Sequence, residues 1–108
     1  MMNLNDYQEQ ANDMAIYPGS ARLTYPALGL TGEAGEVADK VKKLIRDNRK
    51  LTTKERVEIA KEVGDVLWYV AALARDLGVD METIARLNLE KLRDRAQRGV
   101  IGGSGDDR

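Results

Sequence analysis

The pattern of apolar and polar positions predicts helices along almost the whole chain. Apolar residues recur at intervals of three, four and seven through residues 26–46, among them Leu30, Val37, Val41 and Leu44. That spacing places them on one face of an α-helix. No stretch of the sequence alternates apolar and polar residues in the way that a half-buried strand does. The pattern therefore predicts an all-α fold with helices over residues 4–15, 26–46, 52–77 and 80–97.

Capping residues mark where these helices should begin. Asn3 or Asn5 precedes the first helix, and Asp80 precedes the fourth. Thr52 and Glu55 have the spacing of a capping box, in which each side chain accepts a hydrogen bond from the other residue's backbone amide. We therefore expect the third helix to begin at this box and to run antiparallel to the second.

The third predicted helix contains a long uncharged stretch. The nine residues 66–74 include no charged side chain, and a helix that is apolar all round must be buried on more than one side. Four helices of one short chain cannot easily cover every face. We therefore expect a four-helix antiparallel bundle completed by homo-oligomerisation. Residues 1–98 would form this domain, and residues 99–108, with four glycines, would form a mobile tail.

Composition narrows the class of protein. The 108 residues are 43% apolar and 32% charged, with a net charge of −1, which fits one globular domain and gives no reason to expect a nucleic-acid partner. Without His or Cys, the chain cannot build zinc sites or His-based nucleophilic sites. No apolar run is long enough to cross a membrane, and the cytoplasm is the default expectation.

Two pairs of carboxylates are the leading candidates for chemistry. Glu33 and Glu36 are separated by 25 residues from Glu62 and Asp65, and the spacing within each pair puts both side chains on one helix face. Such pairs are common on solvated helix faces. These, however, border the apolar stripes. If the two helices pack antiparallel, four carboxylates converge, which requires a cation, and all-oxygen ligation favours Mg²⁺ or Mn²⁺.

Cations and an amide form a second group of candidates. Lys40 and Lys43 lie two turns beyond the first acidic pair on the same face, although surface lysines often occupy such positions. Asn88, Lys91 and Arg95 continue the apolar stripe of the fourth helix, which makes them candidates for phosphate binding. The alternative for these three is an amphipathic helix end that reaches out to water.

Two further features allow alternative interpretations. Trp68 and Tyr69 could stack on a nucleobase, but packing in a core or an interface is the more common role of such residues. Four glycines inside predicted helices serve either close helix packing or space for a bulky anionic ligand. These glycines are Gly29, Gly32, Gly35 and Gly64.

Both acidic motifs, with their neighbours, resemble a known family. The run Gly-Leu-Thr-Gly-Glu-Ala-Gly-Glu-Val-Ala at 29–38, the run Glu-Val-Gly-Asp-Val-Leu-Trp-Tyr at 62–69, Asn88-x-x-Lys91 and the ending at 98–108 are similar to MazG-like members of the all-α nucleoside triphosphate pyrophosphohydrolases. The resemblance covers about residues 25–108. It implies an all-helical dimer, or a dimer of dimers, that hydrolyses a nucleoside triphosphate to the monophosphate and pyrophosphate.

The resemblance also implies roles for individual residues. The catalytic residues and Mg²⁺ ligands, with Mn²⁺ as a possible substitute, would be Glu33, Glu36, Glu62 and Asp65. The substrate-binding residues would be Asn88, Lys91, Arg95, Lys40 and Arg108. Water would attack the α-phosphorus, with Glu33 or Glu36 as the proton acceptor. The tail would fold over the nucleotide and bring Asp106 or Arg108 to the substrate.

Other functions remain open at this point. A phosphoribosyl-ATP pyrophosphohydrolase would use the same scaffold, and a non-catalytic, nucleotide-binding regulatory module would retain the acidic residues without turnover. A ferritin-like di-iron bundle is disfavoured, because its Glu-x-x-His ligands cannot exist in a chain without His.

Overall fold

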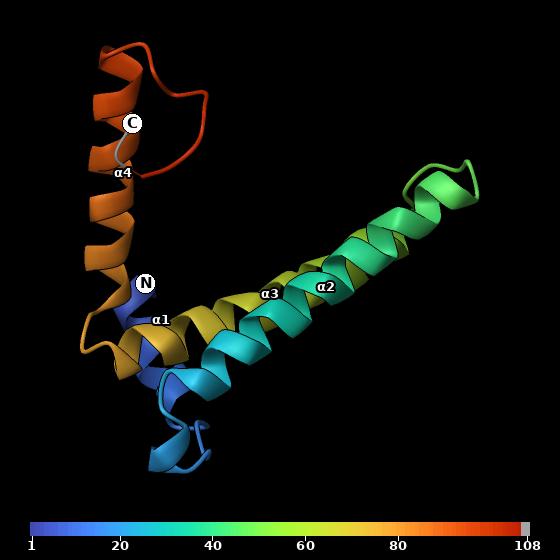
Figure 1. The fold of residues 1–108 in the computed structure, drawn as a ribbon. Coiled ribbons are helices and arrows are strands. Elements are labelled where there is room, and N and C mark those ends of the chain that lie inside the picture. Colours follow the sequence, from blue (N-terminus) through green and yellow to red (C-terminus); the bar gives the residue numbers. More distant parts are fainter. Residues whose placement is uncertain (107–108) are drawn as a thin grey trace.

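The computed structural model describes residues 1–106 and shows only helices in that range, which confirms the all-α class (Figure 1). The elements are α1 (Leu4–Asn12), the short 3-10 helix η1 (Gly19–Ala21), α2 (Thr24–Arg46), α3 (Thr53–Asp76) and α4 (Met81–Gln97). Among the described residues, none of these helices combines the length and the apolar character needed to cross a membrane.

The predicted caps are confirmed at three helix starts. The Asn3 side chain caps α1. At the start of α3, the Thr52 hydroxyl accepts a hydrogen bond from the Glu55 amide at 3.1 Å, and the Glu55 carboxylate accepts one from the Thr52 amide at 3.1 Å. The Asp80 carboxylate accepts a hydrogen bond from the Thr83 amide at 2.7 Å. Local sequence therefore specifies where these helices begin.

Two helix boundaries differ from the prediction by more than one residue. The first helix ends at Asn12 instead of residue 15. The second begins at Thr24, two residues before Pro26, because a proline in the first turn lacks only an amide hydrogen that would have no partner within the helix. Leu23, which precedes this helix, has φ of 68°, and its amide donates a hydrogen bond to the Asp76 carboxylate at 2.9 Å.

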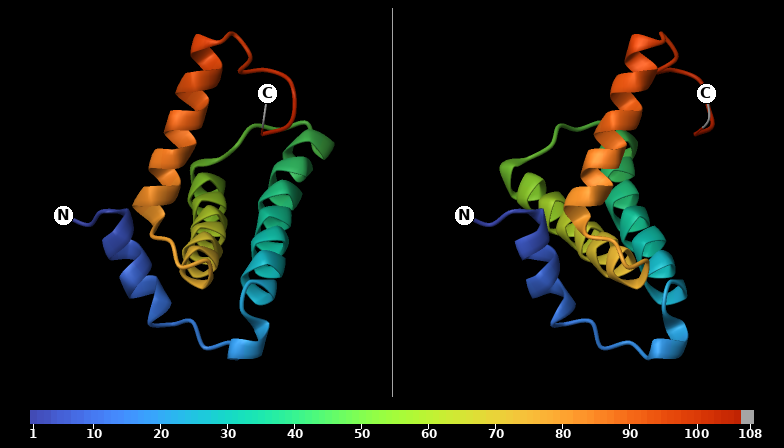
Figure 2. Two further views of the ribbon diagram at one scale, coloured as in Figure 1. Left: turned by 60° about the vertical axis from the view of Figure 1, so that its left-hand side comes forward. Right: turned by 90° about the vertical axis from the view of Figure 1, so that its left-hand side faces the viewer.

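The helices of one chain do not close into an antiparallel bundle. Helices α2 and α3 lie side by side as a long antiparallel hairpin, and α1 crosses α3 near the open end of that hairpin (Figures 1 and 2). Helix α4 contacts α1 and the end of α3, and then stands away from the hairpin as a second arm (Figure 1). The single chain is therefore an open, two-armed structure, and the expected completion of a bundle by homo-oligomerisation stays a prediction.

The core lies where α1, α3 and α4 meet. Ala11, Ala71, Ala74 and Met81 are buried there, and partly buried side chains surround them, including Trp68. The Trp68 indole N–H donates a hydrogen bond to the Ala11 carbonyl at 3.1 Å, which assigns this residue to core packing. The small alanine side chains allow the helices to approach closely.

The uncharged stretch of α3 is covered more fully within one chain than its sequence suggests. Ala71, Ala72 and Ala74 are at most 1% exposed, because α1, α2 and α4 all contact α3. The expectation that one chain leaves this stretch open is therefore wrong for its C-terminal half. Nearer the acidic pair, Val63 remains 50% exposed and Leu67 remains 37% exposed.

Candidate functional site

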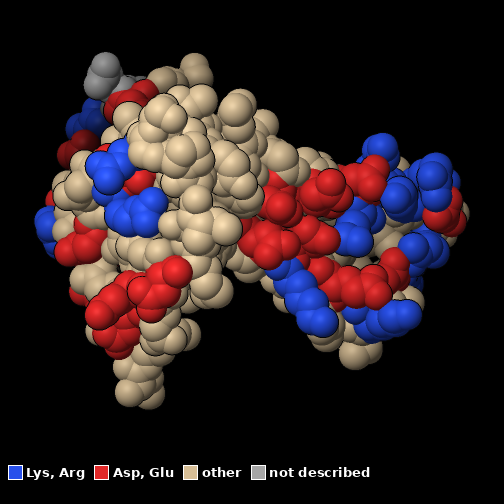
Figure 3. All heavy atoms as spheres, turned by 90° about the horizontal axis from the view of Figure 1, so that it is seen from below, with Lys and Arg blue, Asp and Glu red and all other residues tan. Residues whose placement is uncertain are grey.

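The hairpin brings three of the four predicted carboxylates together. Glu33 of α2 meets Glu62 and Asp65 of α3, and one carboxylate oxygen from each lies within 4.8 Å of the others. Glu33 and Glu62 are half-buried, whereas Asp65 is exposed. Glu36 lies one turn further along α2, exposed and outside this group. Figure 3 shows Asp and Glu side chains gathered on the hairpin where it leaves the rest of the molecule.

The three carboxylates form a site of concentrated negative charge. Partial burial raises the pKa of Glu33, and the negative charges of Asp65, Glu62 and Glu36 raise it further. Within the described part of the chain, no ion pair neutralises the three clustered carboxylates. A bound cation would relieve the repulsion and stabilise the charged forms. The cluster therefore has the ligand atoms and the charge of a site for a hard divalent metal.

The helix glycines divide into two groups. A side chain added at Gly29 would overlap the Tyr69 ring, so this glycine serves close packing between α2 and α3. Around Gly32, Gly35 and Gly64, no atom of another element or of a more distant residue lies within 4 Å of the position that a Cβ would take. Close packing within one chain therefore explains only the first of these residues. The other three leave open surface on the two helices that carry the acidic cluster.

Aromatic rings connect the acidic cluster to the chain segment before α2. The rings of Tyr25 and Tyr69 have centroids 6.3 Å apart, and Tyr17 stacks on Tyr25 at 4.7 Å. Burial raises the pKa of Tyr69, and Tyr25 and the charges of Glu33 and Asp65 add to the effect. Sequence analysis did not identify Tyr17, whose only signal was its place beside a helix-breaking proline.

The lysines of α2 lie further along the hairpin. Lys40 is half-buried and lines a hollow of about 190 Å³ between α2 and α3. Two other cations in this hollow are neutralised, Lys43 by Asp39 at 2.8 Å and Arg49 by Glu55 at 2.6 Å. For Lys40, no ion pair is found among residues 1–106. Among the described residues, it is therefore the one cation lining this hollow that has no ion pair.

The predicted cations of α4 lie on the other arm, away from the acidic cluster of the same chain (Figure 1). Arg95 is buried and Lys91 is half-buried, and both contact the C-terminal segment. Asn88 is exposed on the same helix. Arg108, a further predicted substrate contact, lies outside the described residues. One chain alone thus separates the acidic candidates from the phosphate-binding candidates of α4.

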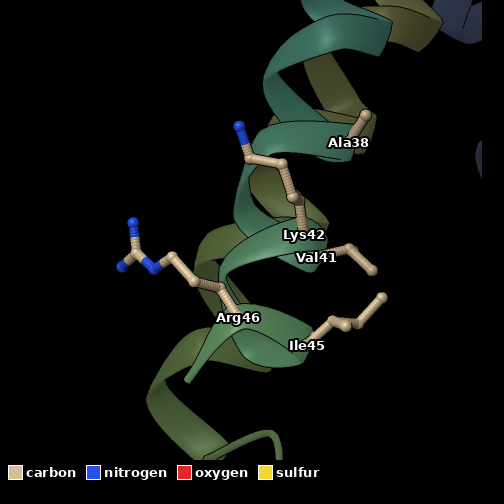
Figure 4. A pocket seen from close by; sticks show the side chains of 5 residues that line it. All are labelled: Ala38, Val41, Lys42, Ile45 and Arg46. Atoms are coloured by element: carbon tan, nitrogen blue, oxygen red, sulfur yellow. The ribbon is translucent and has the colours of Figure 1, made fainter. Parts of the chain in front are cut away.

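A large hollow on the surface is not lined by the acidic cluster. It has a volume of about 730 Å³ and lies along one side of α2, where Ala38, Val41 and Ile45 point in one direction and Lys42 and Arg46 point away (Figure 4). A single helix lines it, so it is an exposed apolar strip and not an enclosed binding cavity. Ile45 is 78% exposed and Val41 is 42% exposed.

The region of this chain that matches known proteins includes both arms of the structure. Residues 24–100 match the model of the MazG nucleotide pyrophosphohydrolase domain, a segment that includes both acidic pairs and all of α4. The chain is also similar to the Gene 37 protein of Mycobacterium phage L5, with 49% identity over 114 residues, covering 99% of this chain and 100% of that protein. No solved structure matches the chain.

Proposed function

The chain belongs to the MazG nucleotide pyrophosphohydrolase family, and from this premise we propose that it hydrolyses a nucleoside triphosphate to the monophosphate and pyrophosphate. The observation that carries the proposal is the convergence of Glu33, Glu62 and Asp65, with oxygens within 4.8 Å of one another. These residues come from two helices and from both acidic motifs. Their convergence is the arrangement that metal-assisted chemistry on a phosphate needs.

The cluster fits Mg²⁺, with Mn²⁺ as a possible substitute. Its ligand atoms are carboxylate oxygens, which hard cations prefer, and the raised pKa of Glu33 reflects burial and like charges that a cation would offset. Glu33, Glu62 and Asp65 would hold the ion. When bound, the metal neutralises charge on phosphate oxygens and lowers the pKa of a coordinated water.

The remaining residues of α2 supply proton transfer and anion binding. Glu36 lies one turn from Glu33 and outside the cluster, so its carboxylate accepts the proton from the water that attacks the α-phosphorus. Lys40 lies one turn beyond Glu36, and its ammonium group contacts the phosphates that leave as pyrophosphate. The two residues thus continue the site along the same face of the helix.

A second copy of the chain completes the site. The strip formed by Ala38, Val41 and Ile45 is exposed in one chain, and covering it with a second copy would remove apolar surface from water. We further propose that in this association α4 of the second copy lies near the carboxylates, where Lys91 and Arg95 would contact phosphate oxygens and Asn88 would orient the substrate. The active form is therefore a homodimer or a dimer of dimers.

Product analysis with a matched pair of variants tests the proposal. Glu62→Gln removes one cluster carboxylate, and Glu9→Gln makes the same change at an exposed position of α1, outside the cluster. We expect the first variant to lose at least about 100-fold in kcat/KM, because even groups that only support metal ligands contribute about 10- to 100-fold. The second should stay close to wild type, and both should keep the same helix content by circular dichroism.

The bond that breaks is identified by the phosphate product. Orthophosphate should appear only after inorganic pyrophosphatase is added, whereas its direct release would contradict cleavage next to the α-phosphorus. A substrate screen should include canonical, deoxy and oxidised triphosphates, with Mg²⁺ or Mn²⁺, and phosphoribosyl-ATP. Turnover of phosphoribosyl-ATP alone would assign the related histidine-pathway activity, and binding without turnover would indicate a regulatory module.

A further inference from the structure

The segment after α4 folds back onto the helix that it follows. The Val100 amide donates a hydrogen bond to the Arg95 carbonyl at 2.9 Å, and Gly99, with φ of 73°, reverses the chain direction at the helix end. The chain then returns along α4 (Figure 1). At Asp106 it reaches two cations of that helix, Lys91 and Arg95.

Hydrogen bonds at Asp106 join the segment to those two cations. The Lys91 ammonium lies 3.1 Å from a carboxylate oxygen of Asp106. The Arg95 guanidinium donates to the same carboxylate oxygen at 3.3 Å, to the Asp106 carbonyl at 2.7 Å and to the Gly105 carbonyl at 3.3 Å. The hydrogen bonds from Lys91 and then from Arg95 lower the pKa of Asp106. The carboxylate is thus held in its charged form as the anion of a two-cation site.

The guanidinium in this site is not fully satisfied by the segment. Arg95 is 4% exposed, and its Nε–H group is buried without a hydrogen-bond partner among the described residues. Its acceptors include two peptide carbonyls, which are uncharged. A phosphate group offers several charged oxygens and can bind a guanidinium through two parallel hydrogen bonds. The site therefore has donor capacity that a phosphate would use more fully than the segment does.

We propose that residues 99–106 form an autoinhibitory latch, in which the Asp106 carboxylate occupies the anion site of Lys91 and Arg95 until a substrate phosphate displaces it. The inference rests on the proposed function for the identity of the displacing anion. The latch is weak because the side chain of Asp106 is 82% exposed, and exposed ion pairs contribute little free energy. It therefore raises the substrate concentration needed for binding without blocking turnover.

Binding of inorganic pyrophosphate to the full chain tests the latch without any hydrolysis. Asp106→Asn removes the competing charge, and Asp94→Asn is the matched control, since Asp94 pairs with Arg98 at 2.9 Å on the same helix. In a metal-free buffer with a chelator, calorimetry should show Asp106→Asn binding pyrophosphate about two- to fivefold more tightly than wild type. The control should bind as wild type does. Equal or weaker binding by Asp106→Asn, or no binding by any variant, would overturn the proposal.

Hydrogen exchange gives an independent readout on the wild-type chain. Pyrophosphate should speed the exchange of backbone amides in residues 100–106, because the displaced segment loses its contacts with α4. Slower exchange in that segment would mean that it closes over the anion, and the latch would be wrong. Both measurements are free of turnover. If they succeed while triphosphates are not hydrolysed, the latch stands and the proposed enzymatic function fails.

Discussion

The two ends of the α2–α3 hairpin differ in how they are held together. At the end near α1, the α3 residues Ala71, Ala72 and Ala74 are almost completely buried by neighbouring helices. At the far end, residues 39–58 include no buried residue, and exposed ion pairs and the Thr52 capping box are its visible polar contacts. One end is stabilised by packing within the chain, whereas the other depends on weak surface interactions.

The acidic cluster lies between these two ends, and its position has a consequence for function. Glu62 and Asp65 precede the buried part of α3, so packing fixes their backbone on one side. On the other side, within residues 1–106, α2 and α3 are supported by each other alone. A partner that covered the far end would stiffen the site from that side as well. One chain therefore supplies the acidic cluster, and assembly would add rigidity at the far end.

The largest expected effect is on the stability of the packed end. The Asp76 side chain is 1% exposed and accepts hydrogen bonds from the Tyr17 hydroxyl at 2.8 Å and from the Leu23 amide at 2.9 Å. We expect Asp76→Ala to lower the free energy of unfolding by about 2–4 kcal/mol, because the Tyr17 hydroxyl and the Leu23 amide lose the buried carboxylate that accepts their hydrogen bonds. Denaturant unfolding measures the change. Asp47→Ala at the far end is the control and should leave the free energy of unfolding unchanged. Equal losses in the two variants would show that the packed end is not the more strongly stabilised one.

A smaller effect is expected on association through the far end. Val41→Asp places a charge in the exposed strip of α2. If a second copy covers this strip, the association constant should fall by about tenfold or more, because burying a valine side chain contributes about 1.5 kcal/mol or more. Light scattering after size-exclusion chromatography gives the mass. Ile16→Asp makes the same change at a 92% exposed position before α2 and should not alter the mass. An unchanged mass for Val41→Asp would contradict assembly through this strip.

Two glycines of α2 distinguish packing from open surface. Gly29→Ala would push a methyl group into the Tyr69 ring, whereas Gly32→Ala would meet open space. We expect Gly32→Ala to raise the free energy of unfolding by up to about 1 kcal/mol through helix propensity. Gly29→Ala should be less stable than Gly32→Ala by about 1–3 kcal/mol because of the crowding. Thermal unfolding of both variants measures the difference, and equal stability would show that the tyrosine moves aside freely.

The smallest effect is a local response of the far end to acid. Hydrogen bonds from Arg49 and from the start of α3 at Thr52 lower the pKa of Glu55 to about 2. Because this pKa is lowered in the folded chain, the interaction is fully present above about pH 4.3, the ordinary value for Glu. It is lost as the pH falls towards about 2. NMR titration of Glu55 should show the low pKa, and Arg49→Gln should raise it; an ordinary value in the wild-type chain would contradict the contact.

The local parts of this fold could be predicted from sequence. Asn3, Thr52 with Glu55, and Asp80 act through hydrogen bonds to residues three positions away, so a short window of sequence contains the whole interaction. Helical periodicity likewise identified α2 and α3. The extra residues predicted at the end of the first helix were wrong, because the boundary there depends on the turn that follows Asn12 and not on periodicity.

The long-range parts could not be predicted in the same way. Periodicity shows which face of a helix is apolar, but not which element covers it, and so the separation of α4 from the hairpin was missed. The same limit applies to the acidic residues. Antiparallel packing predicted their approach, yet the rotation of α2 places Glu36 outside the group that Glu33 joins. The return of the tail to Lys91 and Arg95 was missed because glycines permit many paths.

The backbone at Leu23 fixes the rotation of α2 about its own axis. The Leu23 amide donates a hydrogen bond to Asp76 at the end of α3 at 2.9 Å. The direction of each later side chain of α2 therefore depends on the number of residues between it and Leu23. With 3.6 residues per turn, each residue rotates the helix by about 100°. One residue inserted between Leu23 and Glu33 would therefore swing Glu33 about a quarter-turn away from Glu62 and Asp65. A change of chain length nearly three turns from the carboxylates would dismantle their grouping without altering any of them.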